Sequence, residues 1–269
     1  MSGPIARRDK APEVMKKMRT QAAGLRTGNP VLSADTFRDV HATAGGDVMT
    51  IGGVVNKTAL ALAILVLSAT YAWNAGAAHP GAVGGLTMVG ALGAFAVAIA
   101  TSFRPQWASF TTPLYAVLEG LLLGAVSRTF EARYPGLVAQ AVFLTFGTLG
   151  ALLFLYRTGI IKVTDGFRAG IFAATGGIML FYLVSFVMSL FGHGIPLLHA
   201  ATPLGIGFSL VVTGVAALNL VLDFDFIDRG VRSGAPKSME WYGAFALLVT
   251  LVWLYLEMLR LLAKLQDRD

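Results

Sequence analysis

The sequence predicts an all-α integral membrane protein with seven transmembrane helices, on two observations. Apolar residues make up 55% of the 269 residues and charged residues only 13%, with a mean hydropathy of +0.68. Soluble domains carry about 25% charged residues. Seven apolar stretches also follow one another after residue 50, each long enough to cross the hydrocarbon core of a bilayer.

The stretches are separated by short connections that contain Gly, Pro or Arg, so neighbours in sequence are expected to pack antiparallel. In the third stretch, Ala116, Gly120 and Gly124 recur at four-residue spacing, which predicts a close approach by another helix. The predicted ranges are 54–75, 82–102, 108–129, 137–157, 168–191, 203–226 and 239–263.

Residues 1–50 form a basic tail ahead of the membrane domain, 51–269. The tail holds eight Lys or Arg against five acids and lacks the apolar core of a signal peptide. We expect a mostly flexible segment that touches lipid headgroups; a docking segment for a partner is the alternative. With the amino terminus cytoplasmic, sixteen Lys and Arg fall on the inner side and five outside, which favours that orientation in a cell inner (plasma) membrane.

Several function classes are not expected. Cysteine is absent, which excludes disulfides, thiolate metal sites and cysteine nucleophiles. The net charge of +6 comes without a basic stripe interleaved with aromatics, so nucleic acid is not an expected partner. His79, His193 and His199 have no ligand spacing, and no Ser/His/Asp set or HExxH motif occurs. We therefore expect neither an enzyme nor a bound cofactor or metal.

The last stretch carries an acid, Glu257, inside a predicted span. Such a group is costly in lipid and should face protein or water. Trp241 and Tyr242 are expected in an interfacial aromatic belt at one end of this helix. Arg260 and Lys264 are expected to extend toward water at the other end.

Glu119 lies in the middle of the third stretch, about 12 residues or roughly 18 Å beyond Trp107. Intramembrane acids mark ion routes and proton relays, so we interpret Glu119 as a pathway residue. The alternative is a structural acid that is hydrogen-bonded to a hydroxyl.

The sixth stretch ends with three acids, Asp223, Asp225 and Asp228. Asp223 and Asp225 are about 200° apart on a helix, and Asp223 lies one to two turns inside the span, so it needs a partner. The nearest cation by predicted depth is Arg104, at the end of the second stretch. Arg104 as a topology determinant in water is the alternative. Asp225 is a secondary candidate, and Asp228 is expected to be solvated.

These segments resemble the Bax inhibitor-1/YccA family, also called the transmembrane Bax inhibitor motif family, in its bacterial branch. The resemblance covers residues 29–265 and is specific through the last two helices. It rests on 115–124, on 219–228 and on 240–262. It implies seven helices, with the last one central and wrapped by two three-helix groups. It also implies a pH-sensitive calcium leak or, in some bacterial members, restraint of a membrane-bound protease.

In the family's channel members, a pair of acids forms the pH-sensing pathway and an arginine latches the first of them. By motif, the acids fall on Asp223 and Glu257 and the arginine falls on Arg104. Glu257 is one methylene longer than the family's acid. It lies about 27 Å from the inner boundary, against roughly 9 Å for Asp223, so Glu119 is the expected closer neighbour of Glu257.

The resulting hypothesis is a pH-sensitive cation leak channel gated by intramembrane carboxylates. Calcium would be the transported ion, because carboxylate oxygens are the hard ligands that Ca²⁺ prefers. Asp223, Glu257 and Glu119 would form the ion pathway and pH sensor, with Arg104 and Asp223 as the gate latch. The alternative is a membrane interaction protein that modulates a membrane-bound protease or another quality-control partner. The remaining expected partner is the lipid bilayer.

Overall fold

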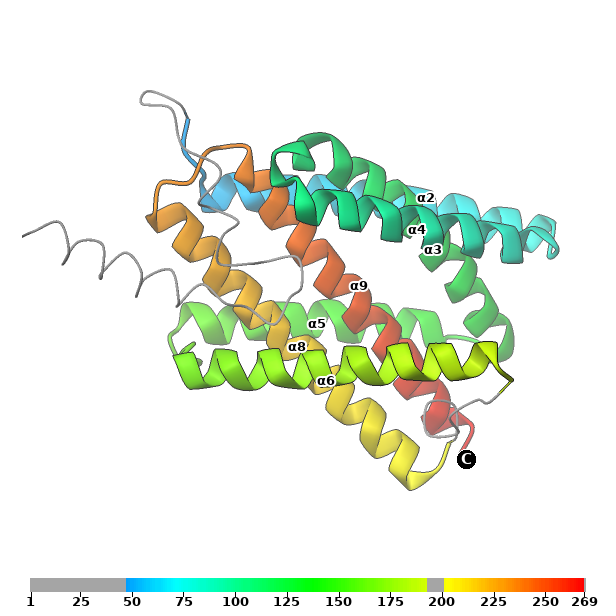
Figure 1. Ribbon diagram of the computed structural model, residues 1–269. Helices are drawn as coiled ribbons and strands as arrows, with labels where there is room; N and C mark the ends of the chain where they lie inside the picture. The colour runs from blue at the N-terminus through cyan, green and yellow to red at the C-terminus, as the bar shows by residue number, and fades with distance from the viewer. Residues whose placement is uncertain (1–46, 193–200, 269) are drawn as a thin grey trace, which may run out of the picture.

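The computed structural model describes residues 47–192 and 201–268 (Figure 1). Seven helices in these residues are long and apolar enough to cross a membrane, which confirms the predicted all-α, seven-span fold. The predicted tail up to residue 46, and His193 and His199, lie outside the described residues. The helices are α2 (Ile51–Ala78), α3 (Ala82–Phe103), α4 (Ala108–Arg133), α5 (Leu137–Arg157), α6 (Asp165–Leu190), α8 (Pro203–Arg232) and α9 (Met239–Gln266), with a short 3₁₀ turn, η1 (Pro105–Trp107), between α3 and α4.

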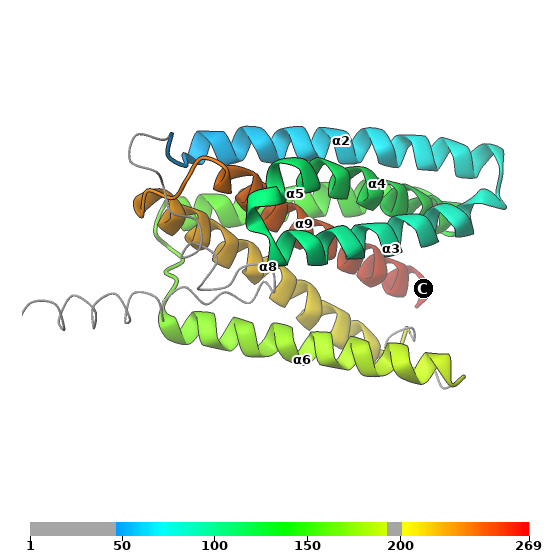
Figure 2. The same cartoon turned by 45° about the horizontal axis from the view of Figure 1, so that its top comes forward.

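Helix α9 is central. It packs against α2, α4, α5 and α8, and even its large side chains, such as Phe245, Leu248 and Leu254, are fully buried. Figure 1 shows α2, α3 and α4 on one side of α9, and α5, α6 and α8 on the other; Figure 2 shows α6 at the outer edge of the bundle. We call the end of the bundle where α2, α4, α6 and α9 begin the Met239 end, and the opposite end the Gln266 end.

Threonine caps explain where three of the helices begin. The hydroxyls of Thr50, Thr164 and Thr202 accept hydrogen bonds from the backbone N–H groups three residues later, at the starts of α2, α6 and α8. Each cap satisfies one of the backbone donors that a first helical turn leaves unpaired. Pro203 follows directly on Thr202, and its fixed φ angle suits the first helical position.

Small residues let α2 and α4 touch through their backbones. A β-carbon at Gly120 would lie 2.7 Å from Cβ of Ser68, and one at Gly124 would overlap the backbone of Ala69. The hydroxyl of Ser68 donates to the carbonyl oxygen of Val117 at 2.6 Å. The close approach predicted from the small residues of the third stretch is therefore confirmed.

Candidate functional site

Glu257 is buried on the central helix, with only 1% of its surface exposed. Its Oε1 accepts a hydrogen bond from the Tyr182 hydroxyl on α6 at 2.9 Å. The same oxygen accepts from Nη1 of Arg260 at 2.7 Å, in an ion pair along α9. Oε2 is also buried and has no hydrogen-bond partner among the described residues. Glu257 thus has one satisfied and one free carboxylate oxygen, and both are sheltered from lipid.

Arg260 forms a second link between α9 and α6, in addition to the bond between Tyr182 and Glu257. Its guanidinium carbon lies 5.4 Å from the centre of the Tyr182 ring, and Nη1 also donates to the Tyr182 hydroxyl at 3.2 Å. The Arg260 side chain remains partly exposed, as expected for a residue that extends toward water.

The expectation that Lys264 extends to water is wrong. This lysine is only 5% exposed, and its Nζ donates to the backbone oxygen of Gly205 at 3.0 Å and to Oγ of Ser209 at 2.8 Å. Both acceptors lie in the first two turns of α8. Lys264 therefore ties the two last helices together, because the start of α8 supplies the oxygens that its ammonium needs.

Glu119 is 6% exposed on α4, and Tyr115, one turn earlier, is its polar neighbour. The Tyr115 ring packs edge-on against Phe245 of α9, with the ring centres 5.1 Å apart. Glu119 therefore lies on the side of α4 that faces the central helix. However, no hydrogen bond or ion pair described for Glu119 or Glu257 joins the two, so the structure gives these acids different partners.

At the Met239 end of α8, Asp223 is fully buried and Asp225 forms ion pairs. Oδ2 of Asp225 lies 3.1 Å from Nη2 of Arg168, at the start of α6, and 3.0 Å from Nε of Arg229. Arg168 is 6% exposed and also bonds Asp165 at 2.8 Å. In the sequence, Arg168 is one of the sixteen Lys and Arg residues on the predicted inner side, and nothing there points to a pairing with Asp225.

The structure does not bring Arg104 to Asp223. Arg104 is exposed where α3 ends, and its guanidinium carbon lies 5.8 Å from the centre of the Trp107 ring. The exposed position fits the alternative interpretation of Arg104 as a topology determinant in water. The arginine that this structure places against the acid-bearing end of α8 is Arg168, and Asp225 is one of its partners.

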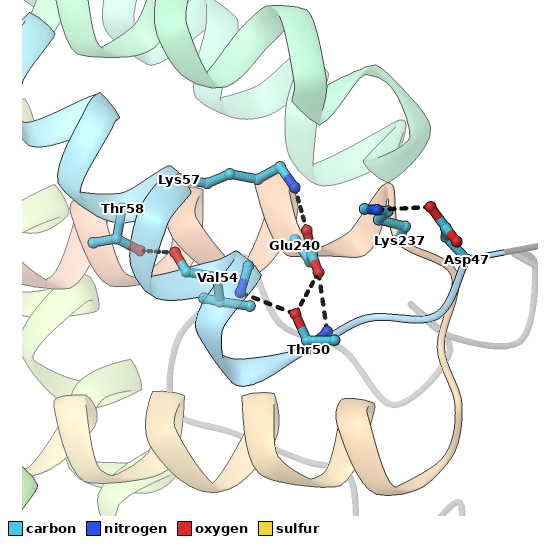
Figure 3. A network of polar contacts seen from close by, with 8 residues as sticks. Asp47, Thr50, Val54, Lys57, Thr58, Lys237 and Glu240 are labelled. Atoms are coloured by element: carbon cyan, nitrogen blue, oxygen red, sulfur yellow. Dashed lines mark hydrogen bonds and ion pairs between the residues drawn. The ribbon is translucent and has the colours of Figure 1, made fainter.

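A further buried acid, Glu240, was not recognised from the sequence (Figure 3). Only 1% of this residue is exposed, in the first turn of α9. Its carboxylate pairs with Nζ of Lys57 and accepts from the backbone N–H (3.0 Å) and hydroxyl (2.9 Å) of Thr50. A β-carbon on Gly53 would overlap the carboxylate, so a larger residue there would have to displace the Glu240 side chain. The sequence did contain a signal for this pair: Glu240 and Lys57 both lie near the start of an apolar stretch, at the same predicted end of the membrane domain.

The chain entering α2 is also tied to the loop before α9. Nζ of Lys237 lies 2.7 Å from Oδ2 of Asp47, the Lys237 N–H donates to the Asp47 carbonyl, and the Met49 N–H donates to the Ala235 carbonyl at 2.7 Å. Figure 3 shows the Asp47–Lys237 pair beside the Glu240 cluster. We call residues 47–50 with these partners the clasp. Tyr242 is completely buried, so its predicted place in an interfacial belt is wrong.

The buried acids could not act together as a preformed metal site. Within the described parts of the chain, no group of three or more His, Cys, Asp or Glu side chains is placed to hold a metal ion. Three of the acids, Glu240, Asp225 and Glu257, instead have separate sets of partners at different depths of the span.

The comparisons with known proteins agree with this architecture. The family described as Bax inhibitor 1 like matches residues 29–267, which includes all seven spanning helices. No curated protein and no solved structure gave a significant match. Because the family match spans most of the chain, and includes the helices that bear Glu119, Asp223 and Glu257, the chain belongs to the Bax inhibitor 1 like family.

Proposed function

We propose that the protein is a pH-sensitive leak pathway for calcium, in which Glu257 contributes the central carboxylate. The observation that carries the proposal is the buried Oε2 of Glu257, which has no hydrogen-bond partner among the described residues. An ionisable group in a span is costly and is retained where it serves an ion or proton route. A free, hard carboxylate oxygen is the kind of ligand that Ca²⁺ takes.

Protonation supplies the pH dependence in this proposal. A proton on Glu257 removes the charge that attracts Arg260, and with it the ion pair at 2.7 Å. Asp223 and Glu119, buried on helices that pack against α9, are the other proposed pathway acids. The role is not enzymatic, and calcium is cargo. The proposed setting is the inner membrane, with the amino terminus cytoplasmic, as the Lys and Arg distribution favours.

The test is calcium flux into liposomes that contain the purified protein alone, measured in mildly acidic and mildly alkaline buffer. Glu257→Gln keeps the size of the side chain but removes its titratable charge, so it is expected to reduce flux and to flatten the pH response. Glu119→Gln is expected to act in the same direction. Glu131→Gln, at the end of α4, is the matched control and should behave as wild type. Wild-type flux in both pathway variants would contradict the proposal.

The alternative function, modulation of a membrane protease or another quality-control partner, is favoured by the clasp. A partner that engages the tail would act next to Asp47 and Met49, which are bonded to the residues before α9. Under this alternative, the purified protein alone supports no flux. Deleting residues 1–28 would then abolish the cellular effect but leave membrane insertion intact.

A further inference from the structure

A groove of about 580 Å³ lies between α2, α4, α5 and α9. Residues such as Leu123 and Leu251 are buried in it, whereas Val66 of α2 and Val142 and Phe146 of α5 are between 38% and 53% exposed at its edges. The groove therefore opens sideways between α2 and α5, on the outer surface of the bundle that faces the hydrocarbon. Its volume is within the range of small-molecule sites, about 300–1,000 Å³.

The lining chemistry fits a hydrocarbon occupant. None of the described residues that line the groove carries a charged side chain. Two of its hydroxyls, those of Ser127 and Tyr255, are hydrogen-bonded to each other at 2.6 Å and so require no polar ligand. The buried acids proposed for the ion pathway do not line it. The groove is thus separate from the proposed calcium route, and the inference does not depend on that route.

The groove has the length of one leaflet. On α2 its lining runs from Leu62 to Asn74, which corresponds to about 18 Å at 1.5 Å per residue. The hydrocarbon core of a bilayer is about 30 Å thick, so this distance covers roughly half of it. On α5 the lining begins at Val138, one residue after the helix starts, so the groove extends from the middle of the span to the Gln266 end.

A cation stands at the Gln266 end of the groove. The guanidinium carbon of Arg128 lies 5.6 Å from the centre of the ring of Trp73, which lines the groove. The aliphatic part of Arg128 packs beside Gly76 at the end of α2. Arg128 is half-buried and forms no ion pair with any residue that the structure describes. Arginine forms charge-assisted hydrogen bonds to phosphate groups. Tryptophan is enriched at the level of the lipid headgroups.

We propose that this groove binds an acyl chain of a phospholipid from the leaflet at the Gln266 end, with the lipid phosphate held by Arg128. The apolar lining, the sideways opening and the leaflet length select an acyl chain. Arg128, which has no ion-pair partner among the described residues, selects a headgroup that carries a phosphate. A second copy of the chain could also cover this apolar face. The experiment must therefore distinguish lipid binding from self-association.

The experiment is native mass spectrometry of the full-length protein in detergent, titrated with phosphatidylglycerol or with a diacylglycerol that has the same chains. The variant Val66→Phe/Val142→Phe fills the groove from both edges. The chain exchanges with an apolar micelle and not with water, so its packing contacts hold it in the groove, and their loss is expected to weaken phosphatidylglycerol binding about tenfold. Val55→Phe is the matched control, because Val55 is also an exposed valine of α2 but does not line the groove.

Arg128→Gln tests the headgroup. It is expected to weaken phosphatidylglycerol binding about tenfold, by the loss of a charge-assisted hydrogen bond, and to leave diacylglycerol binding unchanged. Arg157→Gln, at the other end of α5, should change neither. Equal lipid retention by wild type, the groove variant and Val55→Phe would overturn the proposal. A dimer that the groove variant dissociates, without lipid in the spectrum, would overturn it in favour of self-association.

A second measurement does not depend on the folding of the groove variant. With Trp107, Trp241 and Trp253 replaced by Phe, the fluorescence of Trp73 reports on the groove alone. In phosphatidylcholine vesicles with a small fraction of phosphatidylglycerol brominated on its chains, Trp73 should be quenched more strongly than random mixing predicts. Arg128→Gln should return the quenching to the random value. Random quenching in the unsubstituted Arg128 background would contradict a bound phospholipid.

Discussion

The hydroxyl of Tyr182 on α6 lies 2.9 Å from Oε1 of Glu257 on α9, in the buried part of the bundle. Helix α6 otherwise packs mainly on α8, so this bond is a direct polar link between an outer helix and the central one. The acceptor is the carboxylate proposed to bind calcium. A change in the charge of Glu257 would therefore also change how firmly α6 is held.

Tyr182→Phe is expected to lower the free energy of unfolding by about 1 kcal/mol, the scale of interhelical hydrogen bonds in membranes. In a double-mutant cycle with Glu257→Leu, which leaves no side-chain acceptor, the two changes should be non-additive, because they remove the same bond. Unfolding in mixed micelles is the measurement. Tyr71→Phe, on a 65% exposed tyrosine of α2, is the control. Strict additivity would mean that the Tyr182–Glu257 bond is absent in the membrane.

Gly53→Ala is expected to destabilise the protein by about 1–3 kcal/mol, because its methyl group would overlap the buried Glu240 carboxylate. The neighbouring Gly52→Ala is the matched control: a β-carbon there meets nothing within 4 Å, so only the gain in helix propensity, about 0.5–1 kcal/mol, should remain. The two substitutions should thus shift the thermal unfolding midpoint in opposite directions. A stabilising Gly53→Ala would show that Glu240 does not occupy this position.

The sequence allowed the spans and the close approach at Gly120 and Gly124 to be predicted, because hydropathy and small-residue spacing are properties of each helix by itself. Depth along a helix follows in the same way from the rise per residue. Which side chains meet across helices does not follow, because it depends on the rotation and packing of elements distant in sequence. Three contacts between helices could not be predicted for this reason: Arg168 with Asp225, Tyr182 with Glu257, and Lys264 with Ser209. Lys264 in particular was predicted to extend toward water, because the sequence does not show that the start of α8 lies beside it.

The clasp should respond to acid through Asp47. Lys237 donates a hydrogen bond to Asp47 and attracts its charge, which lowers the pKa of this carboxyl, and the same contact raises the pKa of Lys237. A lowered carboxyl pKa gives stability that is present above the unfolded value of about 3.9 and is lost as pH falls through the folded value. The raised lysine pKa gives stability that is present below about 10.4 and is lost at higher pH. The clasp should therefore be closed across the neutral range.

Hydrogen exchange of the Met49 and Lys237 amides, both bonded within the clasp, measures this closure. After correction for intrinsic rates, protection should fall in wild type as pH drops below about 4. Asp47→Asn should show reduced protection already at neutral pH and no further loss in acid. Asp267→Asn, which removes a carboxylate at the Gln266 end, should leave both amides unaffected. Full protection in Asp47→Asn would mean that the backbone bonds hold the clasp without the ion pair.

The last prediction concerns the arginine that holds the Met239 end of α8. If the leak is gated there, the relevant contact in this structure is the largely buried pair of Arg168 and Asp225, which joins α6 to α8. Asp225→Asn imitates the protonated acid and should raise calcium leak at neutral pH while reducing its pH response. Arg168→Gln should raise the leak about tenfold, which corresponds to a coupling free energy of about 1.4 kcal/mol.

Arg104→Gln is the matched comparison, because Arg104 is exposed beside Trp107 and should leave the leak unchanged. Since removing one partner of a buried ion pair also destabilises a protein, each variant must first show a single cooperative unfolding transition. A leak raised by Arg104→Gln and by Asp223→Asn, but not by Arg168→Gln, would assign the latch to the pair that the family resemblance implies. A leak raised by Arg168→Gln and Asp225→Asn alone would place it between α6 and α8, because only that pair would then hold the closed state.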